Sequence, residues 1–467
     1  MRCLTRVQPT AEQLKIVSRI KPGVEVVRGA AGSGKTTTAI LRLKSLIGMY
    51  KNLRRRAGSD EPVRVLVLTY NRTLRGYISQ LVGEQTKDAA DVTVEISTFG
   101  KWARAICGPV DIASSDEIFT AIARSSNGVD LPNDYLVSEI EYLLGRFKPE
   151  NLDEYLTARR EGRGIAPRVE RQTREQILTT VIPEYRRWLS DHDKIDWNDL
   201  AVSVANTDQN LFYDVLIVDE AQDFSANQIR ALLSYAHDRS STTFVLDTVQ
   251  RIYSRGYSWR EVGVTVRPEN SITLENNYRN TRQIAALAAG LLDNVPTDDD
   301  SAMPDFDASE KEGDMPVLLV GKYSSQLENA LEFIRNRVDL RSQSVAFLHP
   351  KGGGWFQYLR GRLNAQDFEY TEITRMSEWP SGNENIALCT LHSAKGLEFD
   401  HVFVLGINDE VMPSWEDEND DRMILSRKLL AMAVGRAKIS VTLGYKKDDA
   451  SQIIEYIKPN TVSVREV

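Results

Sequence analysis

Short apolar runs rich in valine, leucine and isoleucine recur along the chain, and each ends at a polar or glycine-rich break. Runs of this length, apolar on both faces, are typical of parallel strands that helices cover on both sides. The sequence therefore predicts strands at residues 24–27, 63–68, 215–218, 243–246, 317–320, 344–348, 386–388 and 402–405. We expect an α/β protein in which these strands alternate with helices.

Two stretches depart from this pattern. Residues 101–205 show helical periodicity and turn breakers such as Gly108-Pro109 and Leu131-Pro132, but few strand signals. They predict a mainly helical insertion into the first α/β half. Residues 293–314 are rich in acidic side chains and predict a loop inside the second half.

Composition fits a globular protein with ample core, since 42% of the 467 residues are hydrophobic and 27% are charged. This length suggests two to four domains. No apolar run approaches the roughly 20 residues that cross a bilayer, and the N-terminus lacks the apolar stretch of a signal peptide. The cysteines at 3, 107 and 389 are far apart, which argues against a disulfide framework or zinc ribbon. We expect a reduced, cytoplasmic protein.

The net charge of −8 at first argues against a nucleic-acid partner. However, residues 293–314 alone carry a net charge of −8 and residues 408–421 carry −7, which leaves +7 for the rest of the chain. Both acidic stretches are interpreted as solvated loops. Net charge therefore excludes no partner, and the motifs must decide.

The first motif follows the predicted strand at 24–27. Residues 29–36 read Gly-Ala-Ala-Gly-Ser-Gly-Lys-Thr, and a helical stretch at 37–46 comes next. This is the pattern of a phosphate-binding loop in its proper strand–loop–helix context, where backbone N–H groups and the helix N-terminus surround phosphate oxygens. We expect Lys35 to neutralise the β- and γ-phosphates and Thr36 to ligate Mg²⁺. The candidate nucleotide-binding residues of this loop are Gly29, Ala30, Ala31, Gly32, Ser33, Gly34, Lys35, Thr36 and Thr37.

A second motif follows the strand predicted at 215–218. Two adjacent carboxylates, Asp219 and Glu220, stand where that strand ends. This arrangement suits hydrolysis of a magnesium–nucleotide complex, with Asp219 holding the metal and Glu220 polarising the attacking water. By itself the pair also fits a solvated turn after a core strand, so its interpretation depends on the Lys35 loop.

Together with six further blocks in the same order, these motifs resemble the UvrD/Rep group of superfamily 1 helicases. The resemblance covers residues 13 to about 445, and residues 390–399 (Thr-Leu-His-Ser-Ala-Lys-Gly-Leu-Glu-Phe) are its longest match. It implies two RecA-like P-loop NTPase domains that close around ATP and Mg²⁺, with single-stranded DNA, or a junction with duplex, as the partner. It also implies movement in the 3′→5′ direction.

The resemblance assigns roles to single residues of the nucleotide site. By analogy with the family, Gln13 reads the adenine edge, Tyr278 stacks on adenine and Glu398 contacts the ribose. Gln250 senses the γ-phosphate. The two arginine fingers correspond to Arg279 and Arg436.

The same resemblance implies DNA contacts at Tyr70, Asn71, Thr98, Phe99, Thr390 and His392. Here the sequence also departs from the family: residues 254–259 read Ser-Arg-Gly-Tyr-Ser-Trp where an aromatic-Arg-Gly is usual. The base-stacking aromatic is therefore either Tyr257 or Trp259. Trp102, beside apolar neighbours, fits the core better than a base-stacking position.

The resemblance also divides the chain. The first RecA-like domain (1A) is expected at residues 1–98 and 206–275, with the helical insertion (1B) at 99–205 and the second domain (2A) at 276–467. Full-length relatives insert an accessory domain, 2B, before the Thr390 block. Only fifteen residues separate Tyr370 from Ile386, so residues 371–385 predict a short loop and a compact core without 2B.

Two basic stretches leave alternatives open. Residues 158–174 contain six arginines and are either a solvated helix pair or a phosphate track. Residues 51–56, Lys-Asn-Leu-Arg-Arg-Arg, fit a solvated loop better than a binding surface.

Three functions remain possible from the sequence. The leading hypothesis is an ATP-dependent DNA helicase or translocase. The second is a DNA-dependent ATPase that acts as sensor or motor for a separate nuclease or other effector, in antiviral (phage) defence or DNA repair. The third is a small-molecule phosphotransferase that uses the Lys35 loop, for which added DNA would not change activity.

Overall fold

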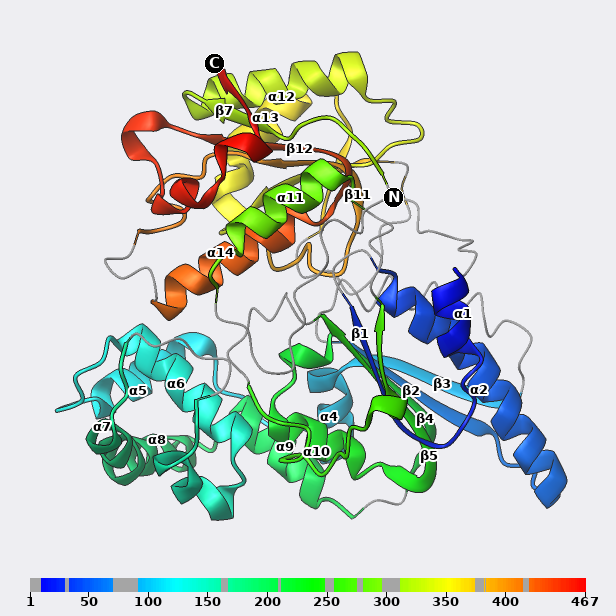
Figure 1. Ribbon diagram of the computed structural model, residues 1–467. Helices are drawn as coiled ribbons and strands as arrows, with labels where there is room; N and C mark the ends of the chain where they lie inside the picture. The colour runs from blue at the N-terminus through cyan, green and yellow to red at the C-terminus, as the bar shows by residue number, and fades with distance from the viewer. Residues whose placement is uncertain are drawn as a thin grey trace.

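The computed structural model describes residues 10–29, 33–69, 91–160, 167–208, 211–247, 256–274, 280–295, 311–373, 382, 384–414 and 420–467. Two α/β halves lie one above the other, and a group of helices inserted into the first half lies beside its sheet (Figure 1). Each half is built on one sheet, and every strand pairing between the named strands is parallel.

The first sheet has the order β3-β2-β4-β5-β1-β6. Its strands are β1 (Gly23–Gly29), β2 (Val63–Thr69), β3 (Val92–Thr98), β4 (Tyr213–Asp219), β5 (Ala236–Asp247) and β6 (Ser271–Leu274). The side chains of β2 and β4 are almost all buried on both faces, as their apolar runs predict.

Helices cover the two faces of this sheet. On one face α2 (Lys35–Ala57) packs against alternate residues such as Val65 and Ile217. On the other, the core residues of β2 and β4 meet α4 (Phe99–Cys107), α9 (Trp197–Asn206) and α10 (Ala226–Leu233). Helix α1 (Ala11–Val17) lies beside α2 at the edge that carries β6.

Between α4 and α9 the described residues are mainly helical and have a core of their own. They form α5 (Ser115–Ser125), α6 (Asn133–Arg146), a 3-10 segment (Pro149–Leu156), α7 (Arg171–Gln176), a π-helical turn (Ile177–Val181) and α8 (Ile182–Asp191). The two alternatives for the basic stretch at residues 158–174, a solvated helix pair and a phosphate track, do not describe all of its arginines. Arg160 forms a buried ion pair with Glu139 (2.9 Å), and Arg174 donates to the carbonyl oxygens of Tyr155 and Ala158. Both arginines therefore hold the insertion together.

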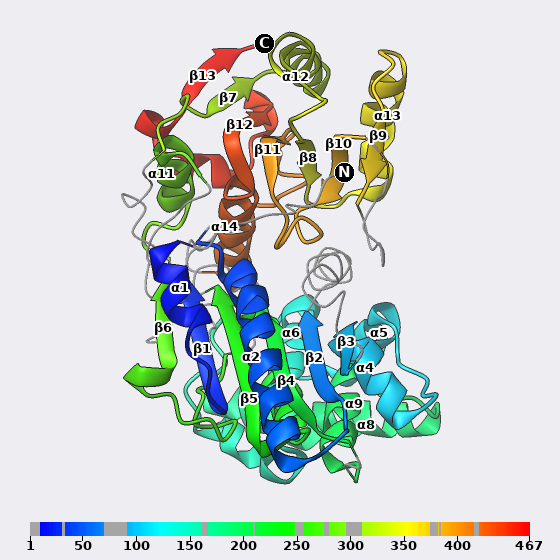
Figure 2. The ribbon, with the colours of Figure 1, turned by 90° about the vertical axis from the view of Figure 1, so that its right-hand side faces the viewer.

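The second sheet has the order β13-β7-β12-β11-β8-β10-β9 (Figure 2). Its strands are β7 (Val317–Val320), β8 (Val345–His349), β9 (Tyr370–Glu372), β10 (Ile386–Thr390), β11 (Phe399–Val404), β12 (Ala437–Tyr445) and β13 (Ser463–Glu466). Helices α11 (Arg282–Leu291) and α14 (Asp421–Val434) cover one face, and α12 (Tyr323–Arg337) and α13 (Gln357–Asn364) cover the other.

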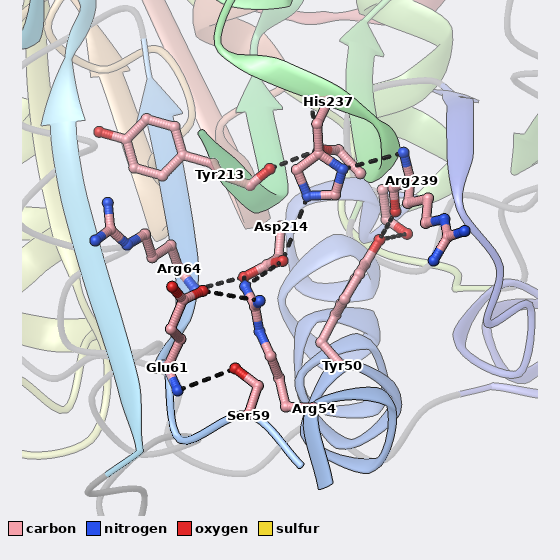
Figure 3. Close-up of polar contacts among 11 residues, drawn as sticks. Tyr50, Arg54, Ser59, Glu61, Arg64, Tyr213, Asp214, His237 and Arg239 are labelled. Atoms are coloured by element: carbon pink, nitrogen blue, oxygen red, sulfur yellow. Dashed lines mark hydrogen bonds and ion pairs between the residues drawn. The ribbon is translucent and has the colours of Figure 1, made fainter. Parts of the chain in front are cut away.

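The prediction of a loop at residues 51–56 is wrong, because α2 continues to Ala57. In the basic end of this helix, Arg54 pairs with Asp214, a buried residue of β4 (Figure 3). The Asp214 carboxylate accepts hydrogen bonds from Arg54 Nη2 (3.0 Å) and from the backbone N–H of Arg64 (2.9 Å), and His237 Nε2 lies 3.4 Å away. This polar cluster fastens α2 to the amino-terminal edge of the sheet.

Side chains also join the two halves. In the insertion, Tyr135 Oη lies 3.0 Å from Asp421 Oδ2, at the start of α14, and Arg422 of the same helix lies 3.4 Å from Asp134. Lys395, in the loop after β10, reaches the acidic turn after β4. Within the described ranges, no helix has the length and apolar character needed to span a membrane.

Candidate nucleotide site and nucleic-acid face

The turn between β1 and α2 has the geometry of a phosphate-binding loop at both of its described ends. Gly29 ends β1 in a place with no room for a side chain, since a Cβ there would lie 2.5 Å from Ser33 Oγ and 2.9 Å from the carbonyl oxygen of Leu274. Gly34 is left-handed (φ 78°) and directly precedes Lys35, the first residue of α2. Lys35 and the half-buried Thr36 and Thr37 therefore occupy the N-terminal turn of a long helix, where backbone N–H groups favour an anion.

Gln13 lies against this loop. Its backbone and side chain form a capping box with Thr10 at the start of α1, which fixes the side chain. Gln13 Nε2 donates to the carbonyl oxygen of Ser33 (3.3 Å), and only 3% of the residue is exposed. A residue 20 positions away in sequence is thus held beside the turn, as its proposed contact with a nucleotide base requires.

Asp219 and Thr36 form the centre of the site. Thr36 Oγ1 lies 3.0 Å from both carboxylate oxygens of Asp219, the last residue of β4. Burial, and next the charge of Glu220, raise the pKa of the Asp219 carboxyl, so a bound cation would relieve this repulsion. A hydroxyl and carboxylates at this depth are the oxygen ligands that Mg²⁺ prefers, and these residues fit that ion.

Glu220 has a left-handed backbone (φ 52°), a conformation that costs a non-glycine residue energy and that is concentrated at functional sites. Gln222 Nε2 donates to its carboxylate (2.5 Å). The backbone turn directs the Glu220 side chain toward a cation of the second half: Lys395 Nζ lies 3.5 Å from Glu220 Oε2 and 2.5 Å from Asp223 Oδ2.

Lys395 belongs to the motif at residues 390–399, where the sequence predicts no role for it. In the structure it is 3% exposed and bridges two acidic residues across the interface between the halves. The sequence placed Lys395 in a loop after a predicted strand, at the carboxyl edge where functional loops of a parallel sheet gather, but it did not place Lys395 beside the acidic residues of the first half.

Two predicted nucleotide contacts of the second half are bound inside that half. Arg436 is 2% exposed, its Nε donates to the carbonyl oxygen of Met432 (3.1 Å), and its Nη1 donates to that of Leu397 (3.4 Å). Glu398 is paired with Lys438 (3.2 Å). Both side chains therefore make contacts within their own half.

Several predicted site residues lie outside the described residues, and their roles stay predictions. They are Ala30, Ala31, Gly32, Tyr70, Asn71, Gln250, Tyr278 and Arg279.

Three of the predicted DNA contacts lie at, or just after, the carboxyl ends of parallel strands. Thr98 ends β3, caps α4 and accepts a hydrogen bond from the N–H of Lys101 (3.4 Å). Thr390 ends β10 and forms a hydroxyl contact with Ser393 Oγ (2.9 Å), and His392 beside it is exposed. Thr98 and Thr390 are thus equivalent in position, since each is the last residue of a parallel strand in its own half.

Three of the aromatic candidates of the first half, Phe99, Tyr257 and Trp259, are packed in its hydrophobic core. Their exposures are 4%, 7% and 9%. The Trp259 ring packs on Phe244 with centroids 4.9 Å apart, and Trp102, expected in the core, is also buried there. This burial favours a structural role for all three, because a base can stack only on a ring that is accessible.

Comparison with known families decides the class. Residues 10–264 match the UvrD/REP helicase N-terminal domain, which is more than half of the chain. The chain belongs to the UvrD/REP helicase family. Residues 362–448 match the UvrD-like helicase C-terminal domain, so both halves contribute to this membership. It assigns the chain to the class of ATP-dependent DNA helicases.

Individual relatives are distant in sequence. A probable DNA helicase of Mycoplasma pneumoniae is 22% identical over 89% of this chain and 79% of its own length. The ATP-dependent DNA helicase PcrA of Staphylococcus aureus is 26% identical over 58% of this chain, which covers 38% of PcrA. A solved C-terminal domain of a possible DNA helicase from Lactobacillus plantarum matches 40% of this chain and 98% of its own, with 21% identity and a TM-score of 0.30.

Proposed function

We propose that this UvrD/REP-family protein is an ATP-driven motor that moves 3′→5′ along single-stranded DNA. The observation that supports this proposal most strongly is the bridge from Lys395 to Glu220 and Asp223. It connects the loop that follows Thr390, a predicted DNA contact, to the carboxylates of the hydrolytic site. The bridge thus offers a physical path by which a change at one place would reach the other, as a DNA-coupled ATPase needs.

The proposed domains are 1A (residues 1–98 and 206–275), 1B (99–205) and 2A (276–467), and ATP binds where 1A faces 2A. Lys35 neutralises the phosphates from the start of α2, and Thr36 and Asp219 would hold Mg²⁺. The ion supplies charge neutralisation for the phosphate oxygens. Glu220 orients the attacking water and accepts its proton.

The remaining roles follow from family resemblance. Gln250, Arg279 and Arg436 respond to the γ-phosphate, which draws 2A toward 1A. Arg436 must exchange the carbonyl oxygens of Met432 and Leu397 for phosphate oxygens in this step. Hydrolysis releases the domains, and alternating grip on the strand moves the protein.

The test of hydrolysis is steady-state ATPase activity with and without single-stranded DNA. Wild type is expected to show strong stimulation, and Lys35→Ala and Glu220→Gln are expected to lose roughly 10²- to 10³-fold in stimulated kcat. Matched controls are Lys44→Ala, an exposed lysine of the same helix, and Glu150→Gln, an exposed glutamate of the insertion. Activity that DNA leaves unchanged would contradict the motor and favour the phosphotransferase hypothesis.

Direction is tested separately by single-turnover translocation on oligonucleotides of increasing length. A fluorophore at the 5′ end is expected to report arrival after a delay that grows with length, whereas a 3′-end label reports departure without delay. The reverse pattern would overturn the 3′→5′ assignment and leave the ATPase proposal standing.

A second candidate is a DNA-dependent ATPase that serves a separate nuclease in phage defence or repair. The fifteen residues between Tyr370 and Ile386 favour it, because a helicase core without room for an accessory domain there suits a motor subunit. Co-purification of a nuclease with the tagged full chain, dependent on an intact Lys35, would favour this candidate over a self-sufficient helicase.

A further inference from the structure

The turn after β8 presents an exposed tryptophan beside a lysine. Residues 351–356 read Lys-Gly-Gly-Gly-Trp-Phe, and Gly352 and Gly353 have left-handed backbones (φ 62° and 60°). Trp355 is 39% exposed, while its neighbour Phe356 is buried in the core of the second half. The glycines allow the chain to turn sharply, so that Phe356 fills the core and Trp355 stays at the surface.

The indole of Trp355 is held in a defined orientation. It stacks on the imidazole of His349 with ring centroids 5.2 Å apart and planes 21° from parallel. His349 is itself 6% exposed, and its Nδ1 accepts hydrogen bonds from the backbone N–H groups of Lys351 and Gly352 (both 3.1 Å). His349 therefore supports the indole from one side, and 39% of Trp355 remains exposed to solvent.

A cation accompanies this surface. Lys351 Nζ lies over the Trp355 ring, 5.2 Å from its centroid, and donates to the carbonyl oxygen of Glu410 (2.7 Å), which fixes its position. An indole next to an ammonium group is the combination that binds single-stranded nucleic acids, with the ring stacking on a base and the cation attracting the phosphate.

The turn lies directly against a predicted DNA contact. His349 and Thr390 are paired residues at the ends of neighbouring parallel strands, and the N–H of Leu391 donates to the carbonyl oxygen of His349 (3.1 Å). A Cβ at Gly352 would lie 2.6 Å from Thr390 Cγ2, so the two loops are in van der Waals contact. In Figure 2, α13 and β9, which adjoin this turn, lie on the same side of the molecule as β3 and α4, where Thr98 lies.

We propose that Trp355, with Lys351 beside it, is a base-stacking platform of the second half for single-stranded DNA. This inference rests on the proposed function, and it names where a base is gripped next to Thr390. The burial of Phe99, Tyr257 and Trp259 supports it, because these three candidates of the first half leave little ring surface accessible to a base.

The experiment measures binding of fluorescently labelled oligonucleotides without nucleotide, by anisotropy. Wild type, Trp355→Ala and Trp355→Phe are each titrated with an oligo-dT and with an oligonucleotide of equal length made of abasic sites. Phe212→Ala is the matched control, since Phe212 is 44% exposed and precedes β4 at the opposite edge of the first sheet. Midpoints of urea unfolding establish that each variant is folded.

Trp355→Ala is expected to weaken binding of oligo-dT roughly 5- to 100-fold and binding of the abasic strand less than about twofold. Trp355→Phe is expected to keep most of the affinity, and Phe212→Ala all of it. Equal losses on both oligonucleotides, or no loss on either, would overturn the stacking platform. If wild type binds neither strand, the proposed DNA motor fails, which is a different result from an unchanged Trp355→Ala.

Lys351→Ala tests the cation. It is expected to reduce the slope of log K against log[salt] by about 0.7, the value for one phosphate contact on a single strand. An unchanged slope would remove Lys351 from the proposed platform.

Discussion

The carboxyl edges of the two sheets differ in what they expose. In the first sheet this edge carries buried polar groups, with Lys35, Asp219 and Glu220 each at most 9% exposed. Among the described residues, the aromatic candidates Phe99, Tyr257 and Trp259 are inside the core of that half. In the second sheet the same edge carries an exposed aromatic, Trp355, and an exposed histidine, His392. This difference is what the proposed function requires, with a small, charged ligand shielded from water at the first edge and accessible ring surfaces for stacking at the second.

This difference teaches how far a motif predicts an environment. Trp259 and Trp355 are both tryptophans that follow a strand in the sequence, but Trp259 packs on Phe244 and is buried, whereas Trp355 stacks on the buried His349 and is itself 39% exposed. Spacing within a motif identifies which strand end a residue follows. Whether its side chain turns inward depends on which helices cover that strand.

The largest expected effect compares these two tryptophans. Trp259→Ala removes a buried ring and is expected to cost about 3–5 kcal/mol in the free energy of unfolding, whereas Trp355→Ala is expected to cost less than about 1 kcal/mol. Urea unfolding followed by circular dichroism measures both. Equal losses in the free energy of unfolding would contradict the difference between a buried Trp259 and an exposed Trp355.

Next in size is the bridge between the halves. Lys395→Ala removes the cation between Glu220 and Asp223, and DNA-stimulated kcat is expected to fall roughly 10- to 100-fold while DNA-independent hydrolysis falls less. Lys458→Ala, which removes a half-exposed lysine paired with Asp293, is the control. In a double-mutant cycle, Lys395→Ala and Asp223→Asn are expected to be non-additive, and strict additivity would argue against coupling through this bridge.

The exposed edge also predicts a dependence of stability on pH. Burial, and the nearby charge of Lys351, lower the pKa of His349 to about 4. The unfolded imidazole binds a proton below about pH 6.5, so the stability that the neutral form contributes is full above that pH and is lost as the pH falls toward 4. Between pH 7 and pH 5 the expected loss is about 1–2 kcal/mol. His349→Gln should flatten this part of the profile, and an identical slope would contradict the assignment.

The smallest expected effect concerns the contact between the insertion and α14. Tyr135→Phe deletes the hydroxyl that lies 3.0 Å from Asp421 Oδ2 and is expected to cost about 0.5–1.5 kcal/mol in unfolding free energy. Asp421→Asn, combined with it in a cycle, separates this contact from the hydrogen bond that Arg160 donates to the same hydroxyl. No change would show that the halves are joined elsewhere.

Much of the strand framework could be predicted because central parallel strands are apolar on both faces. The eight predicted runs correspond to β1, β2, β4, β5, β7, β8, β10 and β11. Strand β3, with Thr93 and Glu95 between its apolar residues, was not predicted, because it lies at the sheet edge, where one face is less covered. Strands β9 and β13, at the two edges of the second sheet, were not predicted for the same reason. Strand β12 was also not predicted, and its Ile439 is exposed.

The candidate site was predictable where a backbone pattern defines it and not where tertiary contacts do. Glycine spacing located the turn before Lys35, and an apolar strand located Asp219. In contrast, nothing in the sequence showed that Lys395 would lie 2.5 Å from a carboxylate 172 positions earlier, or that Arg436 would bind carbonyl oxygens of its own half.

The strand order of the first sheet has a consequence for the protein as it leaves the ribosome. Strand β1 does not touch β2; its neighbours are β5 and β6, and β4 and β5 must enter between β1 and β2. At about 5–20 residues per second, β1 waits about 10–40 s for its first partner while the insertion is still being synthesised. The phosphate-binding turn is therefore formed late, and nascent chains are expected to need protection from aggregation over that interval.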